Sequence, residues 1–157
     1  MAINTSKYNW FTFFKLPAAW WCGVRLKYMD DQSAITTVKY GWVNQNPFKS
    51  MFWAVQGMAA EFSTGVLVTN KILESGKKIS MLVASNKAVF SKKATGRITF
   101  TCVDGPLIQE ALDKAVTTGE GQTFWMRSEG VNEEGVLVST FEFEWTVKEK
   151  SKPSSSN

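Results

Sequence analysis

Glu61 is the only charged side chain in a long apolar stretch, the 21 residues from Ser50 to Asn70. A carboxylate is costly to bury unless it is paired, hydrogen-bonded or protonated. Glu61 therefore has two interpretations. It is a structural group tied to backbone amides or to an arginine, or it is a general base or nucleophile that acts on a bound substrate. The stretch by itself leaves both open.

The stretch around Glu61 has the periodicity of a buried helix. Apolar side chains recur at spacings of three and four residues, and they are Met51, Val55, Met58, Phe62 and Val66. A second face is small apart from the carboxylate and contains Ala54, Gly57, Glu61, Thr64 and Gly65. Small side chains let another backbone approach closely or leave room for a ligand. We therefore expect a central helix that covers residues 50–70 and ends at Glu74-Ser75-Gly76, with Glu61 buried on it.

A loop precedes this helix. It spans residues 44–49 and contains two asparagines and Pro47, which forbids helix continuation. Ser50 is the expected N-cap. The first N–H groups of the helix would then point back at the loop, where they can receive an anion or a polarised carbonyl oxygen.

Two residue counts exclude whole classes of site. The chain has no histidine, which removes histidine triads, histidine bases and histidine metal ligands. Its two cysteines, Cys22 and Cys102, are too few for a disulfide framework and lie among apolar residues, so we expect buried free thiols and no metal site.

Charge is unevenly distributed along the chain. The net charge is +4, of which the last ten residues contribute +2. So weak a positive charge does not favour nucleic acid as a partner. A basic cluster between residues 71 and 97 has a net charge of +6 and contains Lys71, Lys77, Lys78, Lys87, Lys92, Lys93 and Arg97. It either binds the phosphates of a ligand or is a solvated basic face.

The remaining pattern predicts an α+β protein of one domain. We expect a helical preface over residues 1–22, a second helix over residues 106–118 and a disordered tail at residues 148–157. Six strands are expected as three consecutive hairpins, at residues 24–29 with 34–43, 79–90 with 96–103, and 122–131 with 135–147. Together they predict an antiparallel sheet around the central helix, within a domain over residues 1–147.

The start of the chain bears on its location. No signal peptide and no integral membrane segment are recognised, which predicts a cytoplasmic protein. Residues 4–15 are rich in aromatic side chains. They either lie on a membrane surface, form the wall of an acyl pocket, or cover the core as a lid, and the absence of a basic face favours the lid.

Three segments carry a resemblance to a known family: LPAAWWCGVRL, NQNPFKSMFWA and AAEFSTG. They resemble the DUF4442 family of hotdog proteins, which are thioesterase-like and related to the PaaI-like acyl-CoA thioesterases. The resemblance extends over residues 15–147. It implies the hotdog fold, in which a curved six-stranded antiparallel sheet wraps around one long helix.

The resemblance also implies roles for individual residues. Glu61 matches the carboxylate that acts on the thioester, and Asn46 matches an asparagine that orients water or the thioester. Phe52, Trp53 and Ala54 stand where backbone N–H groups polarise the thioester carbonyl, a place where relatives often have His-Gly-Gly. Gly57, on the small face of the helix, is a further candidate for substrate contact.

Phosphate binding by four lysines and an oligomeric state are also expected. By resemblance, Lys77, Lys78, Lys92 and Lys93 would bind the phosphates of coenzyme A, which is part of the substrate and no separate cofactor. A homo-oligomer, either a dimer or a tetramer, is implied as well.

Three functions follow from these residues. The first is hydrolysis of a fatty or aromatic acyl-CoA thioester at Glu61. The second is non-catalytic binding of acyl chains or other apolar ligands, which the missing His-Gly-Gly favours. The third is a structural or regulatory dimer without a ligand.

Overall fold

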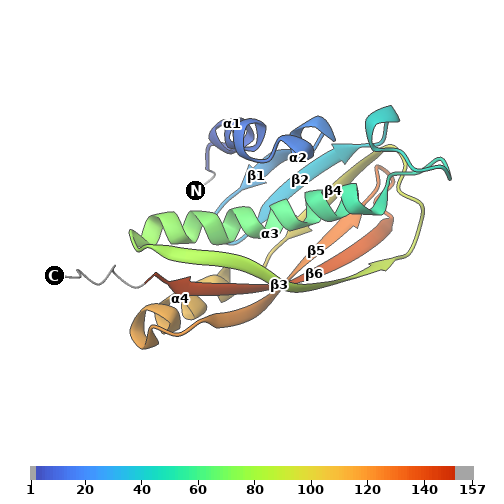
Figure 1. The fold of residues 1–157 in the computed structure, drawn as a ribbon. Helices are drawn as coiled ribbons and strands as arrows, with labels where there is room; N and C mark the ends of the chain where they lie inside the picture. Colours follow the sequence, from blue (N-terminus) through green and yellow to red (C-terminus); the bar gives the residue numbers. More distant parts are fainter. Residues whose placement is uncertain (1–2, 151–157) are drawn as a thin grey trace.

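The computed structural model describes residues 3–150, which form one sheet around one long helix (Figure 1). The strands are β1 (Arg25–Met29), β2 (Ala34–Lys39), β3 (Ile79–Phe90), β4 (Arg97–Cys102), β5 (Gln122–Val131) and β6 (Leu137–Glu149). The helices are α1 (Thr5–Lys15), α2 (Pro17–Trp21), α3 (Trp53–Ser75) and α4 (Pro106–Thr118), with a 3-10 helix at Trp42–Asn44. Helix α3 packs against β1, β2, β4, β5 and β6, and the predicted α+β architecture is confirmed.

All neighbouring strands are antiparallel, in the order β1-β2-β4-β5-β6-β3. The predicted hairpins β1–β2 and β5–β6 are confirmed. The predicted hairpin between residues 79–90 and 96–103 is wrong, because β3 pairs with β6 while β4 lies between β2 and β5. Burial explains the exchange. Ile98, Phe100 and Cys102 of β4 are fully buried and need neighbours on both sides, whereas most of β3 is exposed and suits an edge.

The start of α3 differs from the prediction. The helix begins at Trp53 with Phe52 as its N-cap residue, and no side chain caps it. Ser50 is not the N-cap, because its amide and its hydroxyl both donate to Asn46 Oδ1 at 3.3 Å. These bonds hold Ser50 in the loop, so the N-cap lies two residues later than expected.

The other element ends also have local causes. Gly76 follows α3 with a φ of 65°, a left-handed conformation that glycine adopts without steric cost, so α3 ends at Ser75, within the predicted Glu74-Ser75-Gly76 stop. Strand β6 continues to Glu149, so the predicted domain end at residue 147 is two residues short and Lys148 and Glu149 belong to the sheet. The rest of the predicted disordered tail, from residue 151, lies outside the described residues.

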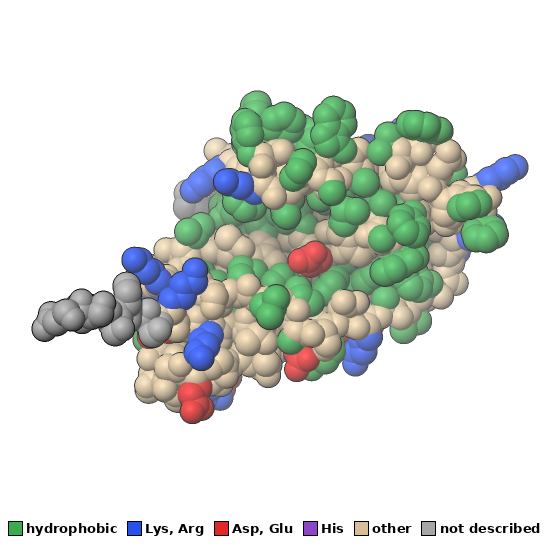
Figure 2. All heavy atoms as spheres, viewed as in Figure 1, with side chains coloured by type: hydrophobic (Ala, Val, Ile, Leu, Met, Phe, Trp, Pro, Cys, Tyr) green, Lys and Arg blue, Asp and Glu red, His purple; other side chains and the backbone are tan. Residues whose placement is uncertain are grey.

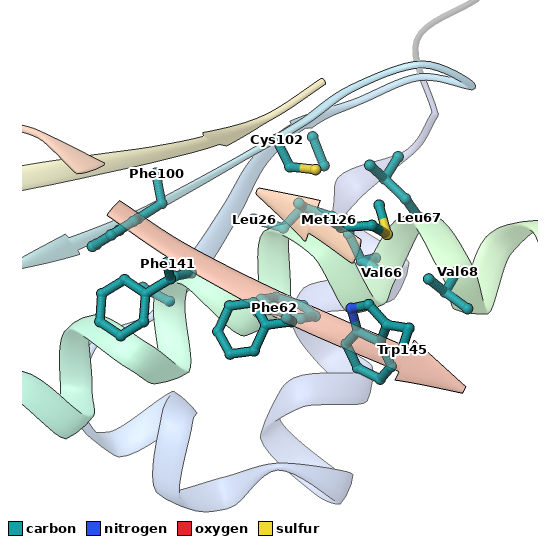
Figure 3. Packing of buried hydrophobic residues seen from close by; sticks show 14 of the residues in the cluster. Leu26, Phe62, Val66, Leu67, Val68, Phe100, Cys102, Met126, Phe141 and Trp145 are labelled. Atoms are coloured by element: carbon teal, nitrogen blue, oxygen red, sulfur yellow. The ribbon is translucent and has the colours of Figure 1, made fainter. Parts of the chain in front are cut away.

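The core lies between α3 and the sheet. Phe62 and Val66 of α3 pack with Phe141 and Trp145 of β6, and Figure 3 shows Phe62 beside these aromatic side chains. A Cβ on Gly57 would lie 3.4 Å from Phe141 Cε1. Such a Cβ would make an ordinary van der Waals contact, so Gly57 faces Phe141 of β6, which is the packing interpretation of the small face rather than room for a ligand.

Buried polar pairs fix the rotation of α3 about its axis. Ser139 Oγ donates to Gln56 Oε1 at 2.8 Å, and the hydroxyl oxygens of Ser63 and Ser128 lie 2.7 Å apart. Trp145 Nε1 also donates to Thr64 Oγ1 at 3.0 Å. Residues of an α-helix are about 100° apart, so Glu61 lies about 160° around the helix from Ser63. The contacts that hold α3 on the sheet therefore turn Glu61 away from it.

The helical preface is confirmed, and Figure 1 shows α1 and α2 beside α3. Asn4 caps α1 by accepting a hydrogen bond from the Ser6 amide. Tyr8 Oη donates to Asn70 Oδ1 of α3 at 2.7 Å. The side chain of Asn9 exchanges two hydrogen bonds with the backbone of Leu26 in β1. The preface is thereby attached to both α3 and the sheet.

Candidate active site

Glu61 lies on the open side of α3, at the edge of a cavity of about 360 Å³. The prediction that Glu61 is buried among core residues is wrong, because its side chain is exposed. The lining consists of Tyr8, Phe11, Lys15, Leu16, Pro17, Ala18, Ala19, Met58, Glu61, Phe62, Gly65, Val66, Thr69, Met81 and Trp145. We refer to this space as the Glu61 cavity. Figure 2 shows the same face of the molecule, where hydrophobic side chains surround an isolated acidic one.

The Glu61 carboxylate is exposed, yet it lies in mainly apolar surroundings. Desolvation raises its pKa above the ordinary value of 4.5. Within residues 3–150 it forms no ion pair. Arg25 donates to the carbonyl oxygens of Trp20 and Val24, and Arg127 pairs with Glu129. Within residues 3–150 the Glu61 carboxylate accepts no hydrogen bond either, so the structural interpretation, a carboxylate tied to backbone amides or to an arginine, is wrong.

The walls of the Glu61 cavity come from distant parts of the chain. One wall is the preface, with Phe11 and Leu16, and the opposite wall is α3. Met81 of β3 and Trp145 of β6 also contribute. The preface therefore walls an apolar pocket, one of the three roles considered for it.

A second space lies at the start of α3. This cleft of about 590 Å³ is lined by Asn46, Pro47, Phe48, Ser50, Met51, Phe52, Trp53, Gln56, Phe90, Ser91, Lys92, Lys93 and Ala94. We refer to it as the helix-start cleft. It contains Lys92 and Lys93, the predicted phosphate ligands, and Lys93 Nζ donates to the carbonyl oxygen of Phe48 at 3.0 Å. The cleft combines a helix N-terminus with positive charge, a combination that suits an anion.

Phe52, Trp53 and Ala54 form the first turn of α3. The N–H of Phe52 donates to the carbonyl oxygen of Asn44 at 2.8 Å and is therefore not available to a ligand. The N–H groups of Trp53 and Ala54 have no partner four residues earlier within the helix, and no side chain caps them. These two amides are the donors that the turn can offer, beside the exposed rings of Phe52 and Trp53.

Asn46 organises the loop before α3. Its Oδ1 accepts from the amides of Phe48 and Ser50, and its Nδ2 donates to Ser50 Oγ and to the carbonyl oxygen of Met51. These bonds occupy both ends of the half-buried amide. Asn46 therefore shapes the helix-start cleft and does not reach Glu61.

The predicted basic cluster is not one surface in a single chain. Lys77 and Lys78 precede β3, and Lys92 and Lys93 follow it. A strand rises about 3.3 Å per residue, so the two pairs are separated by roughly 36 Å along β3. Only Lys92 and Lys93 line the helix-start cleft.

The structure separates the two halves of the predicted site. The Glu61 cavity and the helix-start cleft share no lining residue. Trp53 and Glu61 are eight residues apart on α3, which corresponds to about 12 Å along the axis. A thioester carbonyl must lie about 3 Å from both its donors and its attacking group. Glu61 and the first-turn amides of one chain are too far apart for that.

Lys15 and Trp145 are two of the lining residues that the sequence did not indicate. Among the residues that the structure describes, Lys15 is the only basic side chain that lines the Glu61 cavity. Trp145 is held by its bond to Thr64. Strand alternation placed Trp145 on the inner face of β6, but nothing in the sequence indicated that this face reaches Glu61. Within residues 3–150 no group of three or more His, Cys, Asp or Glu side chains is arranged to hold a metal ion.

No protein-family model and no curated protein match the chain. Solved structures do match it over nearly its full length. A protein of unknown function from Pseudomonas aeruginosa, described as a probable thioesterase, is 19% identical with a TM-score of 0.80, covering 96% of this chain and 99% of that one. A protein of unknown function from Chlorobaculum tepidum TLS is 17% identical with a TM-score of 0.81, covering 93% and 94%. A thioesterase from Haemophilus influenzae is 11% identical with a TM-score of 0.72, covering 97% and 95%.

These similarities establish the fold. The predicted hotdog fold is confirmed, because the six-stranded antiparallel sheet around α3 matches thioesterase-like proteins over nearly the whole chain. Membership of the DUF4442 family stays a prediction. No helix within residues 3–150 is both long and apolar enough to cross a membrane.

Proposed function

We propose that this chain is a thioesterase that hydrolyses acyl-CoA, with Glu61 as general base or nucleophile. The observation that carries the proposal is the position of Glu61, a carboxylate that lies at the edge of an apolar cavity and has no ion pair among the described residues. An acyl chain fits the apolar walls, and its thioester carbonyl would lie near the carboxylate. Thioesterases among the structural neighbours support the reaction type.

Two chemical routes lead from this geometry to the products. As a base, Glu61 takes a proton from water, the oxygen attacks the carbonyl carbon, the C–S bond breaks, and the proton passes to the departing thiolate of coenzyme A. As a nucleophile, Glu61 attacks the carbonyl carbon itself, and water then hydrolyses the acyl anhydride. Acid quenching followed by mass spectrometry of the protein distinguishes them, because only the second route leaves an acyl group on Glu61.

The oxyanion donors of this site would come from a second copy of the chain. Strand β3 is at the edge of the sheet, and its outer side has no partner among the described strands. Antiparallel pairing of two β3 edges would join the sheets and direct the start of one α3 toward the middle of the other. The amides of Trp53 and Ala54 in one copy would then serve Glu61 of the other.

The same dimer would reunite the divided lysines. In an antiparallel β3 pair, Lys77 and Lys78 of one copy lie beside the end of β3 in the second copy, where Lys92 and Lys93 are. Four lysines would then surround one helix-start cleft and bind the phosphates of coenzyme A.

A second function is supported by one specific observation. Glu61 and the helix-start amides of a single chain are about 12 Å apart, and aromatic rings border those amides. A monomer with this geometry would bind an acyl chain in the Glu61 cavity without hydrolysing a thioester.

The test is hydrolysis of a panel of acyl-CoAs by the wild type and by Glu61→Gln. Gln keeps the shape of the side chain but cannot act as a base, so kcat is expected to fall about 10²- to 10⁴-fold. Thermal unfolding of both proteins checks that the fold is unchanged.

The control is Glu74→Gln, which changes another α3 carboxylate that lies outside the Glu61 cavity. It should hydrolyse the panel at the wild-type rate. If the wild type hydrolyses no thioester but retains a fatty acid in the cavity, the binding function replaces catalysis. Equal turnover by wild type and Glu61→Gln would disprove the role of Glu61.

A further inference from the structure

Aromatic side chains gather on the outer side of the preface, and we refer to Trp10, Phe13, Phe14, Trp20 and Trp21 together as the aromatic ridge. Three of its side chains are the most exposed, namely Trp10 at 63%, Phe14 at 67% and Trp21 at 71%. Trp10 stacks on Phe14 with centroids 6.0 Å apart, and Phe13 joins Phe14 at 4.9 Å and Trp20 at 5.3 Å. Figure 2 shows hydrophobic side chains gathered over the region where Figure 1 places α1 and α2.

The helices that carry the ridge are fixed to the rest of the protein by side-chain contacts. The bonds of Tyr8 and Asn9 tie the buried side of α1 to α3 and β1. The guanidinium carbon of Arg25 lies 3.5 Å from the ring centroid of Trp20 and connects α2 to β1. The preface is therefore held on the body of the protein with its aromatic side outward.

The charged side chains of the preface and of β1 all have one sign. Residues 3–29 contain the basic side chains Lys7, Lys15, Arg25 and Lys27 and no acidic residue. Lys7, Lys15 and Lys27 are exposed. The prediction that this stretch lacks a basic face rested on α1 alone. The fold adds β1, whose Lys27 belongs to the strand on which α1 is fixed.

We refer to the exposed Lys7, Lys15 and Lys27 as the basic rim of the ridge. We propose that the aromatic ridge of α1 and α2, together with this basic rim, docks the protein on the surface of an anionic phospholipid membrane. Tryptophan and phenylalanine enter the interface between headgroups and acyl chains, and lysines bind anionic headgroups. Docking of this kind stops at the interface and needs no helix that crosses the membrane. It does not depend on whether the protein hydrolyses thioesters.

Charge favours a membrane over a second copy of the chain. A two-fold contact places the same patch of both copies face to face. The basic rim of one copy would then oppose the basic rim of the other, and like charges repel. An anionic surface instead attracts the whole rim at once.

Docking through the ridge would bring the Glu61 cavity close to the membrane. Phe11, Leu16 and Pro17 line the cavity on the inner side of the preface, while Trp10, Phe14 and Trp21 form the outer side. A docked molecule therefore places the cavity close to the level of the lipid, so that an acyl chain can move between the bilayer and the cavity over a short distance.

The test is cosedimentation with two kinds of vesicle, pure phosphatidylcholine and a mixture with about a quarter phosphatidylglycerol. The wild type should bind the anionic vesicles more strongly, lose binding as salt is added, and show a blue shift of tryptophan emission. The triple variant Trp10→Ala, Phe14→Ala, Trp21→Ala should bind at least about tenfold more weakly. The double variant Lys7→Gln, Lys27→Gln should lose about tenfold on anionic vesicles only.

The matched control is Trp125→Ala, which removes an exposed tryptophan from a strand outside the preface and should leave vesicle binding unchanged. Light scattering without lipid checks for self-association. A wild type that binds no vesicle, or a triple variant that binds as well as the wild type, overturns the proposal. The proposal is also overturned if the ridge serves only to hold copies of the chain together. In that case the triple variant would have a lower molecular mass by light scattering than the wild type.

Hydrolysis of a short-chain acyl-CoA in solution separates this proposal from the proposed function. None of the three ridge residues lines the Glu61 cavity. The triple variant should therefore keep the wild-type rate on that substrate, whether or not vesicle binding is lost.

Discussion

The Glu61 cavity and the helix-start cleft lie along one helix but have opposite chemical character. The first is apolar and contains a carboxylate whose pKa is raised. The second contains free helix amides and two lysines. One space suits an acyl chain and a base, whereas the other suits phosphates and a developing oxyanion.

The difference shows why a single chain is an incomplete site. Both spaces are present in every copy, but about 12 Å of helix separates their reactive groups. The open edge of β3 offers a way to bring the cavity of one copy to the cleft of another. Substitutions can alter the Glu61 cavity, the helix-start cleft or the β3 edge that would join them.

The largest effect is expected from breaking the link with Asn86→Pro. Ser91 N donates to the carbonyl oxygen of Val138 in β6. Along an antiparallel strand, successive N–H groups point alternately toward one neighbour and the other. The N–H groups of Ser91, Val89 and Lys87 therefore point toward β6. The N–H of Asn86 faces the open edge. Proline removes that donor and should convert a dimer to a monomer with a loss in kcat of about 10²-fold or more.

Asn86→Ala is the control for this variant, because it keeps the N–H and should remain a dimer at full activity. Light scattering gives the mass, and circular dichroism checks the fold. A monomeric Asn86→Pro with wild-type kcat would show that one chain suffices and would contradict the shared site.

A smaller effect is expected from the cleft lysines. The double variant Lys92→Ala, Lys93→Ala should raise KM for acyl-CoA roughly tenfold, since each exposed pair with a phosphate contributes modestly. Steady-state kinetics measure it, and added salt should weaken the wild type in the same direction.

The pair Lys77→Ala, Lys78→Ala sharpens this result. A dimeric site predicts that KM rises for this variant as well, whereas a site within one chain predicts no change. Lys114→Ala, on α4 beside Glu110, is the control that should leave KM unchanged.

The pH dependence tests the apolar character of the Glu61 cavity. Glu61 must be ionised to act, so kcat/KM should fall as the pH drops through its pKa, at a pH above the ordinary value of 4.5. A rate that is half-maximal at or below pH 4.5 would show that the cavity does not desolvate the carboxylate.

Stability should show the opposite dependence on pH. The folded state holds the proton of Glu61 more tightly than the unfolded state does. The free energy of unfolding therefore decreases as the pH rises from 4.5 through the raised pKa. Glu61→Gln removes this contribution, which urea unfolding at several pH values would measure.

The smallest effect concerns two glycines of α3. Gly57→Ala places a Cβ 3.4 Å from Phe141, an ordinary contact, and should raise the free energy of unfolding by about 0.5–1 kcal/mol. Gly65→Ala places a Cβ 3.1 Å from the Trp145 ring, which is held by Thr64.

The ring must shift in the Gly65 variant, so we expect no gain or a loss of about 1 kcal/mol, with a preference for shorter acyl chains in the narrowed cavity. Urea unfolding and a chain-length series measure both effects. A stability gain equal to that of Gly57→Ala would indicate that the cavity wall yields freely.

Most of the fold could be predicted from local pattern. Helical spacing indicated α3 and α4, and strand alternation indicated all six strands, because each pattern depends only on neighbouring residues. The error at residues 79–103 has a different origin. Pairing of strands is decided by burial across the whole sheet. Strand β4, whose alternate residues are fully buried, and the mostly exposed β3 are exchanged relative to the order of a simple meander.

The candidate site was predicted less completely. Glu61 stood out because a lone charge in an apolar helix is unusual, and it does lie at a cavity. Asn46, by contrast, is occupied by the loop, and Gly57 packs against Phe141. Sequence alone does not show which polar groups are already satisfied, because their partners come from turns and strands that only the fold brings near.

The sequence by itself determined that a long apolar helix with one carboxylate must be wrapped by an antiparallel sheet, since periodicity and side-chain type are local properties. Only the tertiary structure decided which way that carboxylate faces. The polar pairs between α3 and the sheet turn Glu61 toward the preface, and the strand order leaves β3 at an open edge. These long-range contacts place the acid and the amides in separate spaces, and such contacts depend on residues distant in sequence.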